Sequence, residues 1–181
     1  MDYKEKHKDT DDTLVREFVI KLYKEFFNIN LEPTPPKKNL IDLIGVDDSN
    51  FRVEVEHGQW SGDFWNSLKY CNKSNLEFPT VNIPIRKEKH WKESYTHYRK
   101  MVDNSNSYKI NEFVRTNIDF TQFILIKPDT IIDTTKKIYT EFFSNYGKEN
   151  WMSFKREDVL TYNLINGEWV LEEIFEITTV N

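Results

Sequence analysis

The sequence predicts an α/β protein, a sandwich built on a mixed β-sheet. Three observations carry this prediction: an amphipathic helix near the N-terminus, a β-hairpin soon after it, and strands mixed with helix-compatible segments in the remainder. The 181 residues have the length of one domain, and 38% hydrophobic and 15% aromatic residues are enough for a core. We expect residues 1–10 to form a flexible arm and residues 11–181 to form a single domain.

The composition argues against several classes of protein. A net charge of −5 disfavours a uniformly basic nucleic-acid binder, although a local basic face is compatible with it. The single Cys71 rules out an intramolecular disulfide and a cysteine-based zinc finger. The N-terminus is charged rather than apolar, and no stretch approaches the roughly 20 apolar residues of a membrane helix. We therefore expect a cytoplasmic protein with no membrane partner.

The first third of the chain predicts a helix followed by a hairpin. From about Asp11 to Asn28, apolar residues recur at three- and four-residue spacing, with N-cap candidates at Thr10–Asp12. The prolines of "EPTPPKK" then end the helix. Two apolar-rich runs, Leu40–Val46 and Phe51–Glu56, flank the turn composition "DDSN" and predict a β-hairpin.

The later segments predict further strands and helices. We expect "WSGDFWNSLKYCNKS" to be helical from near Ser61 or Asp63, with Trp60 and Trp65 covering the core or shaping the mouth of a site. "EFPTVNIPI" predicts a strand, and Pro84 indicates an edge or a strand end. "FTQFILIKP" predicts a strand, "IIDTTKKIYTEFFSNY" contains a helix-like stretch, and "VLTYNLINGEWVLEEIFEI" predicts a hairpin that turns at "NG".

Three acidic residues of the first hairpin are candidates for a metal site. Asp42 interrupts the apolar run "LIDLIG", where a carboxylate is costly unless it is paired or binds a metal. If the hairpin turns at residues 47–50, Asp42 lies opposite or diagonal to Glu54 and Glu56, at the separation of about 5 Å typical of cross-strand neighbours. Converging carboxylates bind Mg²⁺ or Mn²⁺, which assist phosphodiester hydrolysis. An exposed strand face, with Arg52 as ion-pair partner, explains the two glutamates as well.

A basic segment follows the predicted strand that contains Pro84. Residues 86–100, "RKEKHWKESYTHYRK", hold six Lys or Arg against two Glu, with three aromatic residues interleaved. Cations mixed with aromatic side chains suit a face that binds nucleic acid. The candidates for this contact are Arg86, Lys87, Lys89 and Lys92, of which the first two could reach a phosphate at the metal. A solvated helix face remains an equal alternative.

The stretch "IDLIGVDDSNFRVEVE" resembles the core of the PD-(D/E)XK nuclease superfamily, which includes restriction endonucleases and Holliday-junction resolvases. The family pattern is an Asp on one strand, followed further along by an acid, any residue and usually Lys; Asp42 and Glu54 match the two acids. The resemblance covers about residues 12–100. It implies a restriction-endonuclease-like sandwich, with a central mixed β-sheet flanked by helices, in the order helix, three-strand meander, helix, strand.

The resemblance also implies a function. It indicates a Mg²⁺- or Mn²⁺-dependent endonuclease that cleaves nucleic acid, DNA rather than RNA being the first expectation. Asp42, Glu54 and Glu56 would be the metal ligands, and these three acids with Lys87 would be the catalytic residues. The motif and the segment "NIPIRK" also resemble phage and bacterial relatives of the superfamily. A homodimer is compatible with cutting both strands, but nothing in the sequence identifies a dimer surface.

The chain departs from the family pattern at the lysine. Glu56 occupies that position, although some restriction enzymes of the superfamily carry Glu or Gln there, and Glu56 could act as a general base or as a further metal ligand. The alternative is a catalytically inactive protein on the same fold, of phage or mobile-element origin, that binds nucleic acid or a host protein. An unrelated α/β domain with an interaction role is the third interpretation. Participation of Glu17 or His57 in the site stays open.

Overall fold

The computed structural model describes residues 8–34, 42–58, 60–66, 80–85, 110–132, 138–144 and 147–173. The N-terminal helix α1 (Lys8–Leu22) continues into a π-helical turn, η1 (Tyr23–Phe27). Its end agrees with the prediction, because Asn28 adopts the left-handed conformation with φ 56°. Its start lies before the predicted one, so residues 10–12 belong to the helix and do not cap it. Residues 8–10 carry no apolar periodicity, and the pattern could not reveal them.

The main sheet has seven strands in the order β1-β2-β3-β5-β6-β9-β10. β1 (Leu31–Pro33), β2 (Leu43–Gly45) and β3 (Arg52–His57) form an antiparallel meander. β5 (Glu112–Thr116) lies beside β3 and parallel to it. The antiparallel strands β6 (Gln122–Ile126), β9 (Leu160–Ile165) and β10 (Glu168–Leu171) complete the sheet. The predicted α/β class with a mixed sheet is confirmed.

Both predicted hairpins are present. In the first, Leu43 pairs with Val53, and Asp48 closes the turn by accepting the backbone N–H of Asn50 on its Oδ1 at 2.9 Å. In the second, β9 and β10 are joined at Asn166 and Gly167, whose φ values are 52° and 87°. Positive φ at both central turn positions is what Asn-Gly sequences supply most readily. Local turn chemistry therefore predicted both connections correctly.

A second sheet has three strands in the order β4-β8-β7. β4 (Val81–Ile85) lies at its edge, as Pro84 predicted, beside β8 (Gly147–Phe154) and then β7 (Ile138–Ser144). The helix-like stretch predicted in "IIDTTKKIYTEFFSNY" is found only at its start: Ile131 and Ile132 end the short α4 (Pro128–Ile132), residues 133–137 lie outside the described residues, and the described remainder is β7, which pairs with β8 over its whole length. Pairing with a neighbouring strand overrides a weak local helical pattern. Pro128 and Asp129 begin α4.

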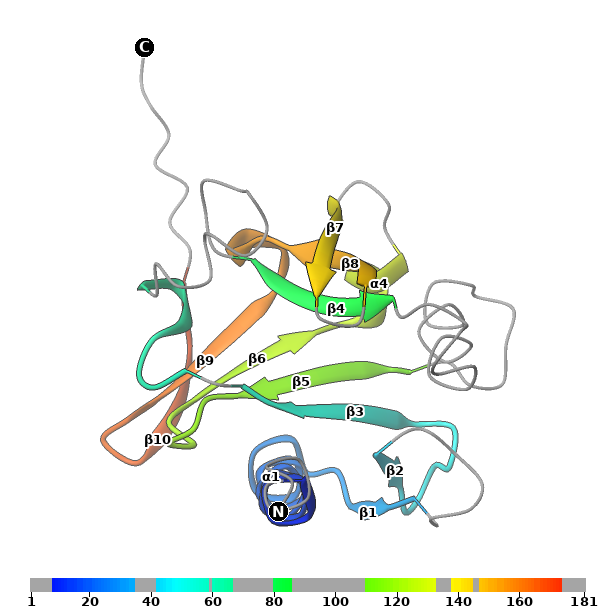
Figure 1. The fold of residues 1–181 in the computed structure, drawn as a ribbon. Helices are drawn as coiled ribbons and strands as arrows, with labels where there is room; N and C mark the ends of the chain where they lie inside the picture. Colours follow the sequence, from blue (N-terminus) through cyan, green and yellow to red (C-terminus); the bar gives the residue numbers. More distant parts are fainter. Residues whose placement is uncertain are drawn as a thin grey trace, which may run out of the picture.

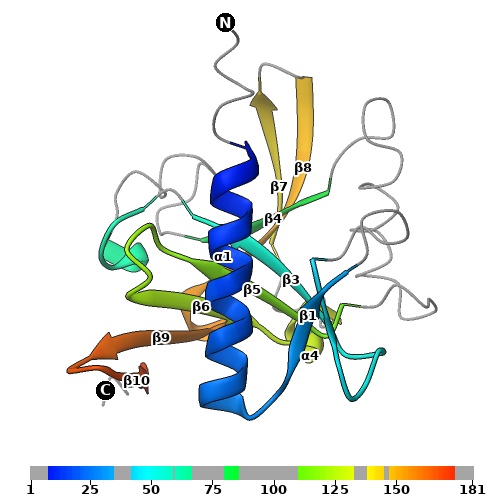
Figure 2. The same cartoon turned by 90° about the horizontal axis from the view of Figure 1, so that it is seen from below.

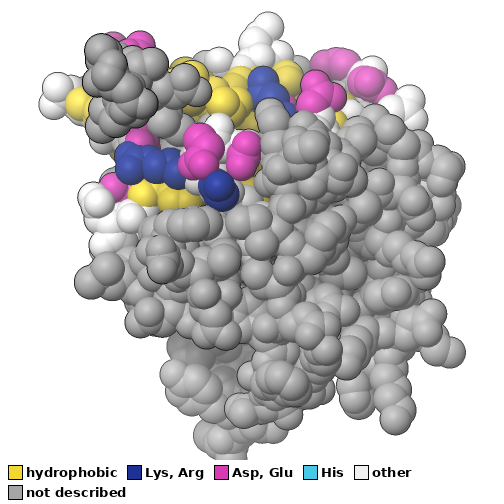
Figure 3. Space-filling model, turned by 90° about the horizontal axis from the view of Figure 1, so that it is seen from above, with side chains coloured by type: hydrophobic (Ala, Val, Ile, Leu, Met, Phe, Trp, Pro, Cys, Tyr) yellow, Lys and Arg dark blue, Asp and Glu magenta, His cyan; other side chains and the backbone are white. Residues whose placement is uncertain are grey.

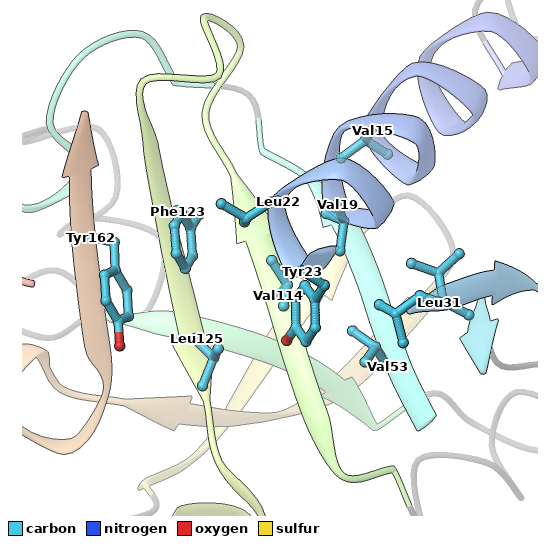
Figure 4. Packing of buried hydrophobic residues seen from close by; sticks show 11 residues of the cluster. Val15, Val19, Leu22, Tyr23, Leu31, Val53, Val114, Phe123, Leu125 and Tyr162 are labelled. Carbon is cyan, nitrogen blue, oxygen red and sulfur yellow. The ribbon is translucent and has the colours of Figure 1, made fainter. Parts of the chain in front are cut away.

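The two faces of the main sheet are covered differently. Figure 1 shows α1 below the main sheet and the second sheet above it, and Figure 2 shows α1 running across β3, β5 and β6. The helix side forms one hydrophobic core (Figure 4), which contains Val15, Val19, Leu22, Tyr23, Leu31, Leu43, Val53, Val114, Phe123, Leu125 and Tyr162. The other side forms a second core, which contains Trp60, Phe64, Trp65, Val81, Ile110, Phe113, Ile124, Ile126, Phe154 and Val159. Both tryptophans are core residues, in agreement with the first of the two predicted roles.

The short 3-10 turn η2 (Phe64–Asn66) is held to the sheet by one buried amide. The side chain of Gln122 accepts the indole N–H of Trp60 at 3.0 Å and the backbone N–H of Phe64 at 2.9 Å. It donates to Oδ1 of Asp63 and to Oδ1 of Asn163, both at 2.9 Å. Asp63 also accepts the backbone N–H of Trp65, so it caps the turn as predicted. Residues 67–79, for which a longer helix was predicted, lie outside the described residues.

The described surface mixes both signs of charge. Where side chains are described on the face seen in Figure 3, from the side of the second sheet, Lys or Arg and Asp or Glu lie next to one another. The described ion pairs around η4 (Arg156–Asp158) include Lys155–Glu157 and Arg156–Glu172, in which Glu172 directly follows β10. Among the helices in the described ranges, none has the length and apolar character that crossing a membrane requires.

Candidate functional site

Asp42 stands directly across from Glu54 at the end of the first hairpin. Leu43 pairs with Val53 in the antiparallel ladder, so the residue before Leu43 falls opposite the residue after Val53. The backbone N–H of Asp42 donates a hydrogen bond to the carboxylate of Glu54. The structure thus brings together the two acids that the sequence singled out, in the register that the "DDSN" turn predicted.

The carboxylate of Asp42 is held from two sides. Its Oδ1 accepts Nε of Arg16 at 2.9 Å and also Nη2 of the same guanidinium, so α1 is tied to the sheet edge. Its Oδ2 accepts the backbone N–H of Val55 at 3.0 Å. This amide points toward the β2 side of β3, where β2 begins only at Leu43, so the carboxylate takes the place of a strand partner. Asp42 is therefore a structural acceptor as it stands.

Glu54 is the buried acid of the group. Only 9% of the residue is exposed, and burial raises its pKa well above the ordinary value of a glutamate. The neighbouring charge of Asp42 raises this pKa further, and the charge of Glu56 adds to it; the Asp42 N–H and the cation of Arg16 act in the opposite direction. The arrangement therefore favours the protonated acid, or a charged acid beside an added cation.

Glu56 is paired with a cation of the adjacent parallel strand. Glu56 stands in register with Arg115 of β5, and its Oε1 lies 3.1 Å from Nη2 of the guanidinium. The guanidinium carbon of Arg115 also lies 5.8 Å from the centre of the Trp60 ring, within range of a cation–π contact. Two residues apart on one strand, Glu54 and Glu56 share the face that looks away from α1, since Val53 and Val55 contact the core on the helix side.

Gly58 makes room for the tryptophan beside this ion pair. A Cβ atom at Gly58 would lie 1.6 Å from Cζ3 and 2.1 Å from Cε3 of Trp60. The ring is 3% exposed and is anchored by its indole N–H to Gln122. A side chain at position 58 would therefore displace the ring that lies next to Arg115.

The sequence left open whether Glu17 or His57 takes part in the site, and neither side chain lies with the three acids. The ring of His57 stacks on Phe120 with centroids 5.5 Å apart, and Phe120 stacks in turn on Phe18 of α1 at 4.7 Å. His57 therefore lies on the helix side of the sheet, opposite to Glu54. Glu17 is exposed on α1, and its neighbour Arg16 is the residue that reaches Asp42.

The three described acids have suitable oxygen ligands for a hard cation, but their side chains do not form a preorganised metal site. Asp42, Glu54 and Glu56 are oxygen donors of the kind that Mg²⁺ and Mn²⁺ prefer. Within the described ranges, no three His, Cys, Asp or Glu side chains are gathered closely enough to hold one metal ion. A metal bound by Asp42 and Glu54 would have to compete with Arg16 for Oδ1 of Asp42. The predicted contacts of nucleic acid, Arg86, Lys87, Lys89 and Lys92, lie outside the described residues.

Sequence reasoning missed the two arginines that neutralise these acids. Arg16 sits inside an amphipathic helix, and Arg115 sits in "NEFVRT", which the sequence did not identify as a strand. The alternation of that segment was the available signal, but nothing in it shows that β5 lies beside β3. No model of a protein family, no curated protein and no solved structure matches the chain.

Proposed function

We propose that the protein is a metal-dependent nuclease of PD-(D/E)XK type, in which Asp42 and Glu54 bind the metal. The observation that carries this proposal is the position of Asp42 directly across from Glu54 on neighbouring strands. Ligands on two paired strands keep a fixed separation, which a metal site for phosphodiester hydrolysis requires. Glu56, in the position of the family's lysine, is engaged with Arg115 instead.

The order of the elements supports the same proposal. A helix, α1, precedes the meander β1-β2-β3, and the next strand of the main sheet, β5, lies beside β3 in parallel orientation. Parallel neighbours require a crossover connection, and the family has a helix at that place. The connection runs through residues 58–111, most of which lie outside the described residues.

The charge balance around Glu54 also favours a cation. Burial and the charge of Asp42 both raise the pKa of Glu54, so a divalent ion between the two carboxylates would relieve the repulsion and stabilise the charged form. A bound Mg²⁺ or Mn²⁺ would neutralise the phosphate and lower the pKa of a bound water. The basic residues Arg86, Lys87, Lys89 and Lys92 remain predicted DNA contacts in this proposal.

The first experiment is a cleavage assay with a metal titration. Plasmid, linear and branched DNA and RNA are incubated with Mg²⁺ or Mn²⁺, using wild type, Asp42→Asn and Glu54→Gln. We expect metal-dependent cleavage by wild type and a loss of about 100-fold or more in both variants, since each lacks a metal ligand. Folded variants that cleave as well as wild type, or a wild type inert on all four substrates, would contradict the enzyme proposal.

A non-cleaving protein on the same fold is the second candidate. It is favoured by the two ion pairs, because Arg16 and Arg115 neutralise acids that a metal would otherwise neutralise. Binding of Mn²⁺ separates the two candidates. If millimolar Mn²⁺ leaves the melting temperature unchanged in wild type and in Glu54→Gln alike, the non-cleaving candidate is favoured. A rise in wild type alone favours the nuclease.

A further inference from the structure

Arg115 lies next to Glu56 and near Glu54, although it is not part of the sequence motif that identified these acids. The parallel ladder puts Arg115 of β5 in register with Glu56 of β3, and Glu54 lies on the same face one pair further along, in register with Phe113. A cation on β5 therefore contacts Glu56, the residue at the position of the family's lysine. Arg115 and Glu56 are close because β3 and β5 pair in parallel, and not because of their spacing in the sequence.

The guanidinium of Arg115 is held in place, and only some of its N–H donors have an acceptor among the described residues. Its Nη2 donates to Glu56 at 3.1 Å, and the Trp60 ring lies against it at 5.8 Å. The Nε of Arg115 is shielded from solvent and donates to no acceptor among the described residues. A guanidinium offers five N–H donors in a planar fork, which matches a phosphate bidentately. Since only Nη2 donates to a described acceptor and Nε is shielded, the outer N–H groups of the fork are the donors that Arg115 can offer to a phosphate.

Three neighbours keep Arg115 in this position. Glu56 anchors one end of the fork, Trp60 supports its face, and Gly58 leaves the space in which Trp60 lies. The side chain of Arg115 is 14% exposed and that of Glu56 is 36% exposed, so the pair is open on one side rather than sealed in a core.

We propose that Arg115 binds a phosphate of the nucleic acid next to Asp42 and Glu54, and that Glu56 positions Arg115 rather than binding a metal. The inference rests on the proposed function for its substrate class. An arginine in this role carries the positive charge of the missing lysine and cannot accept a proton, so it holds the phosphate and does not activate water. Glu56, which occupies the position of the family's lysine, then serves to hold Arg115 in place.

The experiment measures DNA binding separately from DNA cleavage. Fluorescence anisotropy of a labelled DNA duplex is recorded at low salt in Ca²⁺, for wild type, Arg115→Gln, Arg115→Lys and Glu56→Gln. Arg156→Gln is the matched control, because Arg156 also pairs with a glutamate, Glu172, on other elements. Circular dichroism and thermal melting establish that each variant is folded.

We expect Arg115→Gln to weaken DNA binding about tenfold or more, as loss of a charged bidentate contact does. Arg115→Lys should recover part of this loss, because it restores the charge without the fork. Glu56→Gln should leave Mn²⁺ binding unchanged, because Glu56 is not a metal ligand in this proposal. The control should bind as wild type does.

Three results overturn the inference: a wild type that binds no DNA, an Arg115→Gln variant that binds as tightly as wild type, or an equal loss in the Arg156→Gln control. A loss of Mn²⁺ binding in Glu56→Gln overturns the positioning role of Glu56. Failure of the nuclease proposal has a different signature. Wild type would then bind DNA through Arg115 and yet neither bind Mn²⁺ nor cleave.

Discussion

Asp42 and Arg16 join the end of β2 to the N-terminal helix: the carboxylate accepts Nε of the guanidinium at 2.9 Å and, on its other oxygen, the N–H of Val55 at 3.0 Å. One side chain thus ties a helix to the sheet and also ends the β2–β3 ladder. Any role of Asp42 as a metal ligand has to be separated experimentally from this structural role.

The first prediction concerns the stability of Asp42 variants. Asp42→Ala should lower the free energy of unfolding by about 1–3 kcal/mol, because it leaves the Val55 amide and the Arg16 guanidinium without their acceptor. Asp42→Asn keeps an oxygen for one of these donors and should lose less. Urea denaturation measures both values. Glu157→Gln, in an exposed pair 3.6 Å from Lys155, is the control and should change stability by no more than about 0.5 kcal/mol.

The second prediction concerns Glu54 and pH. Because the pKa of Glu54 is raised in the folded state, its contribution to stability is fully present below the ordinary pKa of a glutamate and is lost as the pH rises through the raised value. Glu54→Gln should therefore be more stable than wild type at neutral pH, and the two should converge near about pH 4. Denaturant unfolding across this pH range is the measurement. A parallel pH dependence in both proteins would contradict the raised pKa.

The third prediction concerns the buried Tyr23 and its half-buried partner Glu112. The hydroxyl of Tyr23 donates to Oε2 of Glu112; burial raises the pKa of Glu112, and this hydrogen bond lowers it. Tyr23→Phe should cost about 1–2 kcal/mol at neutral pH, because the half-buried carboxylate of Glu112 loses its donor. The pKa of Glu112 then rises further, so stability should fall more steeply with increasing pH than in wild type.

Tyr162→Phe provides the control for that prediction. Tyr162 stacks on Phe123 with ring centroids 4.6 Å apart, and the ring contact survives the substitution. We expect a smaller change in stability and an unchanged pH slope. If Tyr23→Phe and Tyr162→Phe behave alike at every pH, the Tyr23–Glu112 hydrogen bond contributes nothing measurable.

The fourth prediction concerns Gly58. An alanine Cβ would overlap the Trp60 ring, so Gly58→Ala should cost about 2–4 kcal/mol and shift the ring that supports Arg115. Gly62→Ala is the comparison, because position 62 has φ 67° but open space around it, and only the backbone strain of about 1 kcal/mol applies. Thermal unfolding and tryptophan fluorescence measure the two effects. Equal losses at both glycines would show that overlap with Trp60 is relieved without cost.

Elements with strong local signals were predictable from the chain. The hairpin at residues 42–57 followed from its turn composition, and with it the position of Asp42 opposite Glu54. The turn at Asn166-Gly167 and the edge position of Pro84 followed from the backbone preferences of those residues. Each of these features involves neighbours along the sequence, so propensity and spacing were sufficient.

The sequence alone determined an α/β class, a mixed sheet and the pairing of two acids across one hairpin. Only the tertiary structure decided that Arg16 neutralises Asp42, that Arg115 lies beside Glu56, and that His57 faces the helix. These contacts join residues far apart in the chain: Glu56 and Arg115 are separated by 59 positions. Their proximity comes from the parallel pairing of β3 and β5, and alternation within either strand carries no information on which strand lies next to it.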